Sequence, residues 1–213
     1  MKRFASALVF GIAIAAIPVV AMGATKAPAL VCKATKAMGH TPKVVKAPAK
    51  INPGRIGTFT LVTNCGKIVI RTDGVKAPVT VTALTALAKA KYFDGSLCHR
   101  LTTQGLYVLQ CGDPTATGSG APDFSYKDEN LPKNVVNNYP AGTVAMANSG
   151  PSTNGSQFFL VYGNTTLAPN YTIWGQITSG LNIVKAIAAA GVKGGGPDGP
   201  PKKTIAIEKV ILG

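Results

Sequence analysis

The sequence predicts a mainly β protein whose short strands close into a barrel, with two helices at its plugged ends. Short segments typical of strands recur through residues 57–213, and stretches rich in Gly, Pro and Asn separate several of them. Apolar residues fall at helical spacing in only two places, after Pro78 and over 181–190. Many short strands with so few helices favour a barrel, because closure removes exposed strand edges.

Composition bounds the domain count and excludes several classes of protein. The 213 residues are 46% hydrophobic, which suits one folded domain with an N-terminal extension. The formal net charge is +14, but residues 1–55 hold nine basic and no acidic residues, against 13 basic and eight acidic in the remainder. The folded part is therefore not predicted to bind nucleic acid. Collagen-like, coiled-coil and multi-span membrane classes do not fit this composition.

The N-terminus is predicted to be an export signal. Lys2 and Arg3 precede an uncharged, mostly apolar run over residues 4–22, and small residues follow at 21–24. A basic start, an apolar centre and a small-residue end are typical of a secretory signal, here residues 1–23. The run is long enough for an uncleaved membrane anchor over residues 4–22, which is the alternative. Either way the protein is expected outside the cytoplasm: periplasmic, cell-wall-associated or extracellular.

Residues 24–56 are predicted to be a basic linker. They consist largely of Ala, Lys, Pro and Gly and have no lasting helical or strand period. Proline favours an extended backbone, and the lysines repel one another. One interpretation is a spacer; the other is that these lysines contact an anionic wall polymer or lipid headgroups.

The elements of residues 57–213 follow from local patterns. Residues 59–63 and 67–71 alternate around Asn64-Cys65-Gly66 and predict a hairpin. Pro78 suits the first turn of a helix, and Gly191 suits the end of the helix over 181–190. The remaining strands are expected at 97–101, 107–111, 144–147, 158–162, 172–177 and 204–212.

Conventional catalytic groups are missing from this part of the sequence. His99 is its only histidine, and the acidic residues are dispersed without a recognisable pair. No phosphate-binding loop, dinucleotide fingerprint or zinc-ligand spacing occurs. The sequence therefore gives no sign of covalent, metal or cofactor chemistry, and no cofactor is expected.

Two segments carry a specific resemblance. They are CHRLTTQGLYVLQCGD (98–113) and MANSGPSTNGSQFFLVYG (146–163), supported by APVTV, YFDG, WGQI and IAIEKVIL elsewhere. These motifs resemble the cyclophilin family of peptidyl-prolyl cis–trans isomerases, and the residues inserted in TTQGLYVLQ resemble an actinobacterial branch. The resemblance covers about residues 57–213. It implies a closed, eight-stranded antiparallel β-barrel capped by two α-helices, with a substrate groove on the outer face.

The resemblance also implies an activity and a set of site residues. X-Pro bonds rotate over a barrier of about 18–20 kcal/mol, and no bond need be broken to lower it. Arg100 matches the family's catalytic arginine, which stabilises the twisted peptide. Phe159 is implied as the floor of the proline pocket, whereas Phe158 points into the core. Substrate contacts are implied for Tyr107, Val108, Gln110, Gly118, Ala147, Asn148, Ser149, Gln157, Phe159, Leu167 and Tyr171.

Some positions depart from the family pattern. Tyr107 stands where Phe is usual. Val108 stands where Met is common, so a wider pocket is expected. Tyr171 and Thr166 occupy positions where eukaryotic members have His and Trp. That Trp is the usual contact for cyclosporin, so only weak cyclosporin binding is expected. The expected partners are proline-containing polypeptides, and the expected state is a monomer.

Two questions stay open at the level of sequence. The four cysteines fit two disulfides, with Cys98–Cys111 and Cys32–Cys65 as conceivable pairs, and they equally fit buried free thiols. The same groove suits an exported isomerase or a non-catalytic proline-peptide-binding or chaperone module. The retained Arg100, Gln110 and Phe159 favour the isomerase.

Overall fold

The computed structural model describes Met1 and residues 30–213. The expected signal or anchor, apart from Met1, and residues 24–29 of the expected linker lie outside the described residues. The helices are α1 (Pro78–Lys89) and α2 (Leu181–Ala190). The strands are β1 (Thr58–Thr63), β2 (Gly66–Thr72), β3 (Ser96–Leu97), β4 (Arg100–Thr102), β5 (Val108–Cys111), β6 (Thr143–Met146), β7 (Phe158–Val161), β8 (Ile173–Ser179), β9 (Asp198–Gly199) and β10 (Ala206–Leu212).

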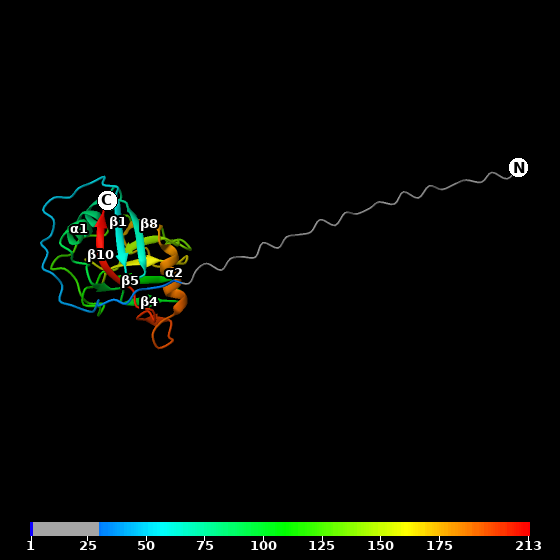
Figure 1. The fold of residues 1–213 in the computed structure, drawn as a ribbon. Helices are drawn as coiled ribbons and strands as arrows, with labels where there is room; N and C mark the ends of the chain where they lie inside the picture. Colours follow the sequence, from blue (N-terminus) through cyan, green and yellow to red (C-terminus); the bar gives the residue numbers. More distant parts are fainter. Residues whose placement is uncertain (2–29) are drawn as a thin grey trace.

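The strands form one antiparallel sheet that curls back on itself (Figure 1). Its order is β3-β10-β1-β2-β8-β6-β7-β5-β4-β9. Only Cys98 and His99 separate β3 from β4, yet β3 pairs with β10 while β4 pairs with β5. This bent strand therefore joins the two ends of the sheet. When β3 and β4 are counted as one strand and the two-residue β9 is set aside, the sheet has the eight strands that the resemblance implies.

Helix α1 begins at Pro78 and α2 spans Leu181–Ala190, as the local sequence predicts. Pro78 occupies the first turn of α1, where its missing N–H costs nothing. The free N–H groups of Val79 and Thr80 donate to the carboxylate of Glu129, at 3.1 and 2.9 Å. Gly191 ends α2 with a φ of 83°, which a residue with a side chain would adopt only under strain.

Apolar side chains form two separate clusters, because successive side chains of a strand point to opposite faces of the sheet and both faces are buried here. The larger cluster fills the barrel and includes Trp174 and Phe158, both fully buried. The smaller cluster lies on the opposite face of β5, β6 and β7 and is centred on Phe159. All residues of β6 and β7 are buried, so both faces of these strands are covered. The inward and outward assignments of Phe158 and Phe159 are confirmed.

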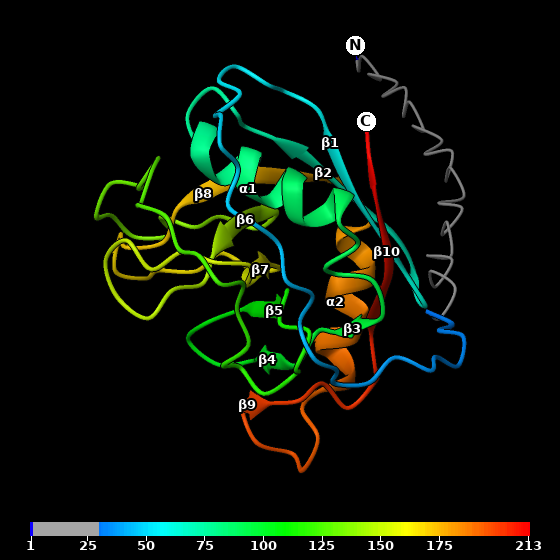
Figure 2. The ribbon, with the colours of Figure 1, turned by 90° about the vertical axis from the view of Figure 1, so that its left-hand side faces the viewer.

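The N-terminal segment, residues 30–57, contains no helix or strand but is fastened to the domain (Figure 2). The backbone of Lys33 bonds Asn64, and the His40 N–H donates to Pro114. Further along, the Asn52 N–H donates to Thr82 of α1. These contacts hold the segment along the barrel surface.

Both conceivable disulfides are present. Cys32–Cys65 ties the N-terminal segment to the β1–β2 turn, and Cys98–Cys111 links the residues next to β4 with the end of β5. The second bridge therefore joins the two strands that carry Arg100 and Gln110.

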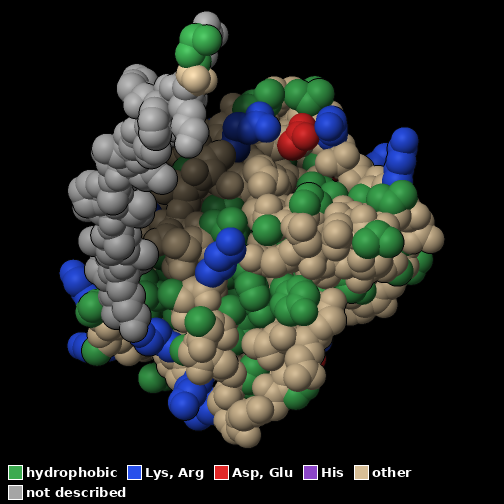
Figure 3. Space-filling model, turned by 90° about the vertical axis from the view of Figure 1, so that its right-hand side faces the viewer, with side chains coloured by type: hydrophobic (Ala, Val, Ile, Leu, Met, Phe, Trp, Pro, Cys, Tyr) green, Lys and Arg blue, Asp and Glu red, His purple; other side chains and the backbone are tan. Residues whose placement is uncertain are grey.

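The surface charge is dispersed where it can be seen. Lys and Arg side chains are spread over the face in Figure 3 and do not merge into one basic patch.

Neither α1 nor α2 is long and apolar enough to cross a membrane.

Candidate active site

Arg100 is held by two partners on neighbouring strands. Its Nε and Nη2 donate to the two carboxylate oxygens of Asp198, at 2.8 and 2.7 Å. Its Nη1 donates to Oε1 of Gln110 at 3.1 Å, across the pairing of β4 with β5. The hydrogen bonds and charge of Asp198 raise the pKa of Arg100, which therefore stays protonated. The side chain is 40% exposed, so this fixed cation remains accessible from solvent.

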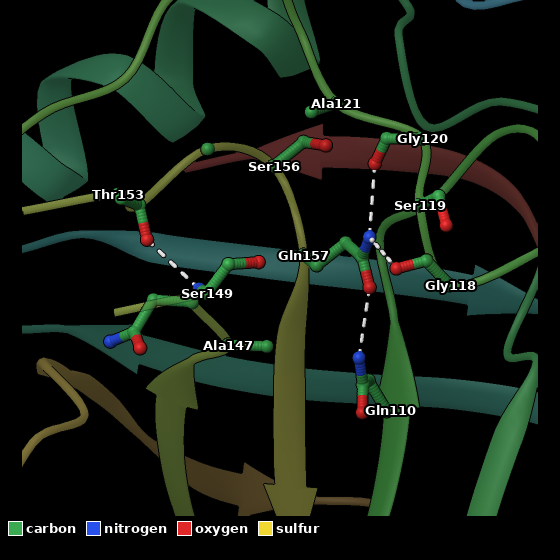
Figure 4. Close-up of a pocket in the computed structure, with 12 residues that line it drawn as sticks. Gln110, Gly118, Ser119, Gly120, Ala121, Ala147, Ser149, Thr153, Ser156 and Gln157 are labelled. Carbon is green, nitrogen blue, oxygen red and sulfur yellow. Dashed lines mark hydrogen bonds between the residues drawn. The ribbon is translucent and has the colours of Figure 1, made fainter. Parts of the chain in front are cut away.

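A chain of side-chain hydrogen bonds continues from Arg100 across the face of the sheet. Nε2 of Gln110 donates to Oε1 of Gln157 at 2.8 Å. Nε2 of Gln157 donates to the backbone carbonyls of Gly118 and Gly120, at 2.9 and 3.0 Å (Figure 4). The two amides thereby connect the arginine to the loop after β5.

A pocket of about 140 Å³ opens beside this chain. Figure 4 shows Gln157 extending across it between the loop and Gln110. The Ser149 N–H donates to Thr153, which fixes the turn on the opposite side. Six of the expected contact residues line this pocket: Gln110, Gly118, Ala147, Asn148, Ser149 and Gln157.

Asp113 holds the loop that forms one wall of the pocket. Its buried carboxylate accepts hydrogen bonds from the N–H groups of Thr115 at 2.7 Å, Thr117 at 3.1 Å and Gly118 at 2.7 Å. Burial by itself would raise the pKa of Asp113. The bonds from the Thr115 side chain and from the loop backbone outweigh burial and hold the pKa below its ordinary value.

We expect Asp113→Asn to lower the free energy of unfolding by about 2–4 kcal/mol at pH 7, because an amide cannot accept all these bonds. The depressed pKa means that the carboxylate stabilises the fold above its unfolded pKa of about 3.8. This stabilisation is lost as the pH falls through the folded pKa. Urea unfolding should therefore show a smaller difference in the free energy of unfolding between variant and wild type in acid than at pH 7. Asp123→Asn, at an exposed carboxylate further along the loop, is the control. An equal difference at both pH values would contradict the account.

The apolar cluster centred on Phe159 adjoins the polar pocket through Ala147. Val108 and Phe159 are buried in it, and Leu167 and Tyr171 pack against it. The structure therefore brings together the expected floor and walls of a proline pocket. The ring of Tyr171 stands edge-on to Phe159, with centroids 5.6 Å apart.

Tyr139 supports this cluster and was not expected from the sequence. Its hydroxyl donates to the Tyr171 carbonyl and accepts from the Tyr171 N–H, both at 3.1 Å. Burial raises the pKa of Tyr139 to about 12, so the hydroxyl keeps its proton. Tyr139 thus fastens the loop that carries Leu167 and Tyr171. Its position in NNYP offered only a turn signal.

Tyr107, which the resemblance implies as a substrate contact, lies outside the Phe159 cluster. Its ring stands edge-on to Tyr162, with centroids 5.9 Å apart, and Leu106 packs against the Phe159 cluster instead. Alternation explains the difference, because residues 106 and 108 share a face that residue 107 does not. Asp198, like Tyr139, was not expected from the sequence. Its only signal was a single carboxylate in a loop rich in Gly and Pro.

The whole arrangement matches a known family. Residues 58–212 match the family described as cyclophilin type peptidyl-prolyl cis-trans isomerase. The chain belongs to this family. Its members include a probable peptidyl-prolyl cis-trans isomerase B of Mycobacterium tuberculosis, 43% identical over 184 residues, which covers 81% of this chain and 58% of that protein. The corresponding protein of Mycobacterium leprae is 39% identical over 195 residues, covering 81% of this chain and 65% of that one.

Solved structures agree on the fold. The crystal structure of a cyclophilin type isomerase from Cryptosporidium parvum superposes with a TM-score of 0.65 at 24% identity, covering 75% of this chain and 98% of the other. The expected cyclophilin family and fold are confirmed, and the mycobacterial relatives agree with the expected actinobacterial branch. The chain spans only about 58–65% of the length of these mycobacterial relatives.

Proposed function

We propose that this protein is a peptidyl-prolyl cis-trans isomerase that accelerates rotation of X-Pro bonds in exported polypeptides. The observation that carries the proposal is the position of Arg100. A fixed, protonated guanidinium is linked by Gln110 to a polar pocket, and that pocket adjoins the apolar cluster around Phe159. Family membership supports the reaction class.

The chemistry requires a cation rather than a nucleophile. Twisting an X-Pro bond removes amide resonance and leaves a lone pair on the prolyl nitrogen. An enzyme accelerates the rotation by binding this twisted form more tightly than either planar form. A guanidinium has five N–H groups, and the contacts with Asp198 and Gln110 use three. Two N–H groups remain to stabilise the twisted peptide, with no covalent intermediate.

The rest of the site would hold the polypeptide. The prolyl ring would occupy the apolar cluster over Phe159, beside Val108 and Leu167. The chain on the other side of the bond would lie along the polar pocket near Asn148 and Gln157. We expect a monomer that needs no cofactor. We also expect cyclosporin to bind weakly, because Thr166 replaces the usual tryptophan.

The site of action is proposed to be outside the cytoplasm. Two disulfides suit an oxidising compartment, and the basic and apolar N-terminal sequence suits export. Residues 30–56 carry six basic and no acidic residues, which favours contact with anionic wall polymer or lipid headgroups. Fractionation of the source cells would test the location.

The function is tested by NMR exchange between the cis and trans signals of a short X-Pro peptide. The full chain, with both disulfides intact, should make exchange much faster than in buffer. This measurement needs no coupling protease. A folded sample that binds the peptide without accelerating exchange would favour the non-catalytic binding or chaperone module instead.

A further inference from the structure

Asp198 reaches Arg100 because a short strand places it there. β9 pairs antiparallel with β4, so that Thr102 lies opposite Asp198 and Leu101 opposite Gly199. The backbone on either side is fastened as well. The Thr103 N–H donates to the Pro197 carbonyl at 2.8 Å, and the Lys193 N–H donates to the Pro200 carbonyl at 2.8 Å. The carboxylate is therefore presented by a braced loop.

Asp198 contacts the guanidinium of Arg100 in a bidentate manner. Nε and Nη2 each donate to a different oxygen of Asp198, at 2.8 and 2.7 Å. This parallel arrangement restrains the plane of the guanidinium as well as its position. An arginine side chain otherwise has many rotamers, and Gln110 contacts only Nη1.

Asp198 also completes the hydrogen-bond chain that crosses the site. Donation runs in one direction from the Gln157 amide to Gly118 and Gly120, from Gln110 to Gln157, and from Arg100 to Gln110. On the other side of the guanidinium, Nε and one N–H group of Nη2 donate to the carboxylate of Asp198. This series of hydrogen bonds thus ends at backbone carbonyl groups on one side and at the charged carboxylate of Asp198 on the other.

We propose that Asp198 is a positioning residue of the isomerase site, which fixes the guanidinium of Arg100 so that its two remaining N–H groups serve the twisted peptide. This inference rests on the proposed function. The ion pair is exposed, with 40% of the Arg100 side chain and 48% of the Asp198 side chain accessible, so its contribution to folding stability is small. The ion pair instead fixes the orientation of the Arg100 guanidinium, and the stabilisation of a transition state depends strongly on such orientation.

The test compares Asp198→Asn and Asp198→Glu with wild type in the full chain. The asparagine variant keeps the size but turns one acceptor into a donor that faces the donors of Arg100. We expect kcat to fall about tenfold with little change in KM. The Arg100 Nε–H signal in nitrogen-15 NMR should exchange faster with water. Asp198→Glu should recover part of both. Glu208→Gln, which removes an exposed acid on β10, should change neither.

Each other outcome decides against the proposal. An unchanged kcat with a changed Nε–H signal would make the contact a surface ion pair. A higher kcat/KM in Asp198→Asn would make Asp198 a competitor of the substrate. If Asp198→Asn is so much less stable that its unfolded fraction accounts for the lost activity, the role of Asp198 is structural. A wild-type chain that fails to accelerate exchange would overturn the proposed function together with this inference.

Discussion

Arg100→Ala is expected to reduce kcat/KM for an X-Pro peptide by about 10²-fold or more. Removing one hydrogen-bond donor that stabilises developing charge commonly costs about 10²–10³ in rate, and this variant removes the whole cation. The fold should persist, because an exposed ion pair contributes at most about 1 kcal/mol. NMR exchange of the peptide and a thermal melt would measure the two effects separately.

Two matched variants sharpen this experiment. Arg71→Ala removes an exposed arginine on β2 and should leave the rate unchanged. Arg100→Lys keeps the charge but lacks the planar guanidinium with its paired N–H donors, so it should retain only part of the activity. Full activity in Arg100→Ala would show that another group supplies the stabilisation.

Removing the disulfides is expected to have the largest effect on stability. Chain-entropy estimates give about 4 kcal/mol for the bridge over 33 residues and about 3 kcal/mol for the bridge over 13 residues. Urea unfolding of the double variants Cys32→Ala/Cys65→Ala and Cys98→Ala/Cys111→Ala, compared with the oxidised wild type, would measure both losses.

The two bridges should differ in their effect on activity. Cys98–Cys111 links the residues beside Arg100 and Gln110, whereas Cys32–Cys65 fastens the N-terminal segment to a turn. We therefore expect the isomerase rate to fall only in the Cys98→Ala/Cys111→Ala variant, at a temperature where both variants are folded. The reverse pattern would point to a role for the N-terminal segment in the groove.

Local chemistry made most of the elements predictable. The β1–β2 hairpin, α1 with Pro78 and α2 before Gly191 all follow from patterns within a few residues. Most of the site residues could be named because the motifs around Arg100 and Phe159 are specific to one family. The pocket and the Phe159 cluster bring together all the expected contact residues except Tyr107.

Contacts between distant segments were not predictable in the same way. The Asp198 carboxylate meets Arg100 only because β9 pairs with β4, nearly a hundred residues away in sequence. Leu106, and not Tyr107, packs against the Phe159 cluster, which depends on the folded path of the residues before β5. The N-terminal segment resembles a linker by composition, yet single contacts such as Asn52 with Thr82 hold it in place.

By itself, the sequence determined the barrel class, its two helices and the motifs of the isomerase family, because these depend on local periodicity and on residues that lie together in the chain. The tertiary structure alone decided the disulfide pairing, the contact of Asp198 with the Arg100 guanidinium and the support that Tyr139 gives to the loop carrying Tyr171. Each of these depends on how the barrel closes in space, and closure brings side chains together regardless of their separation in sequence.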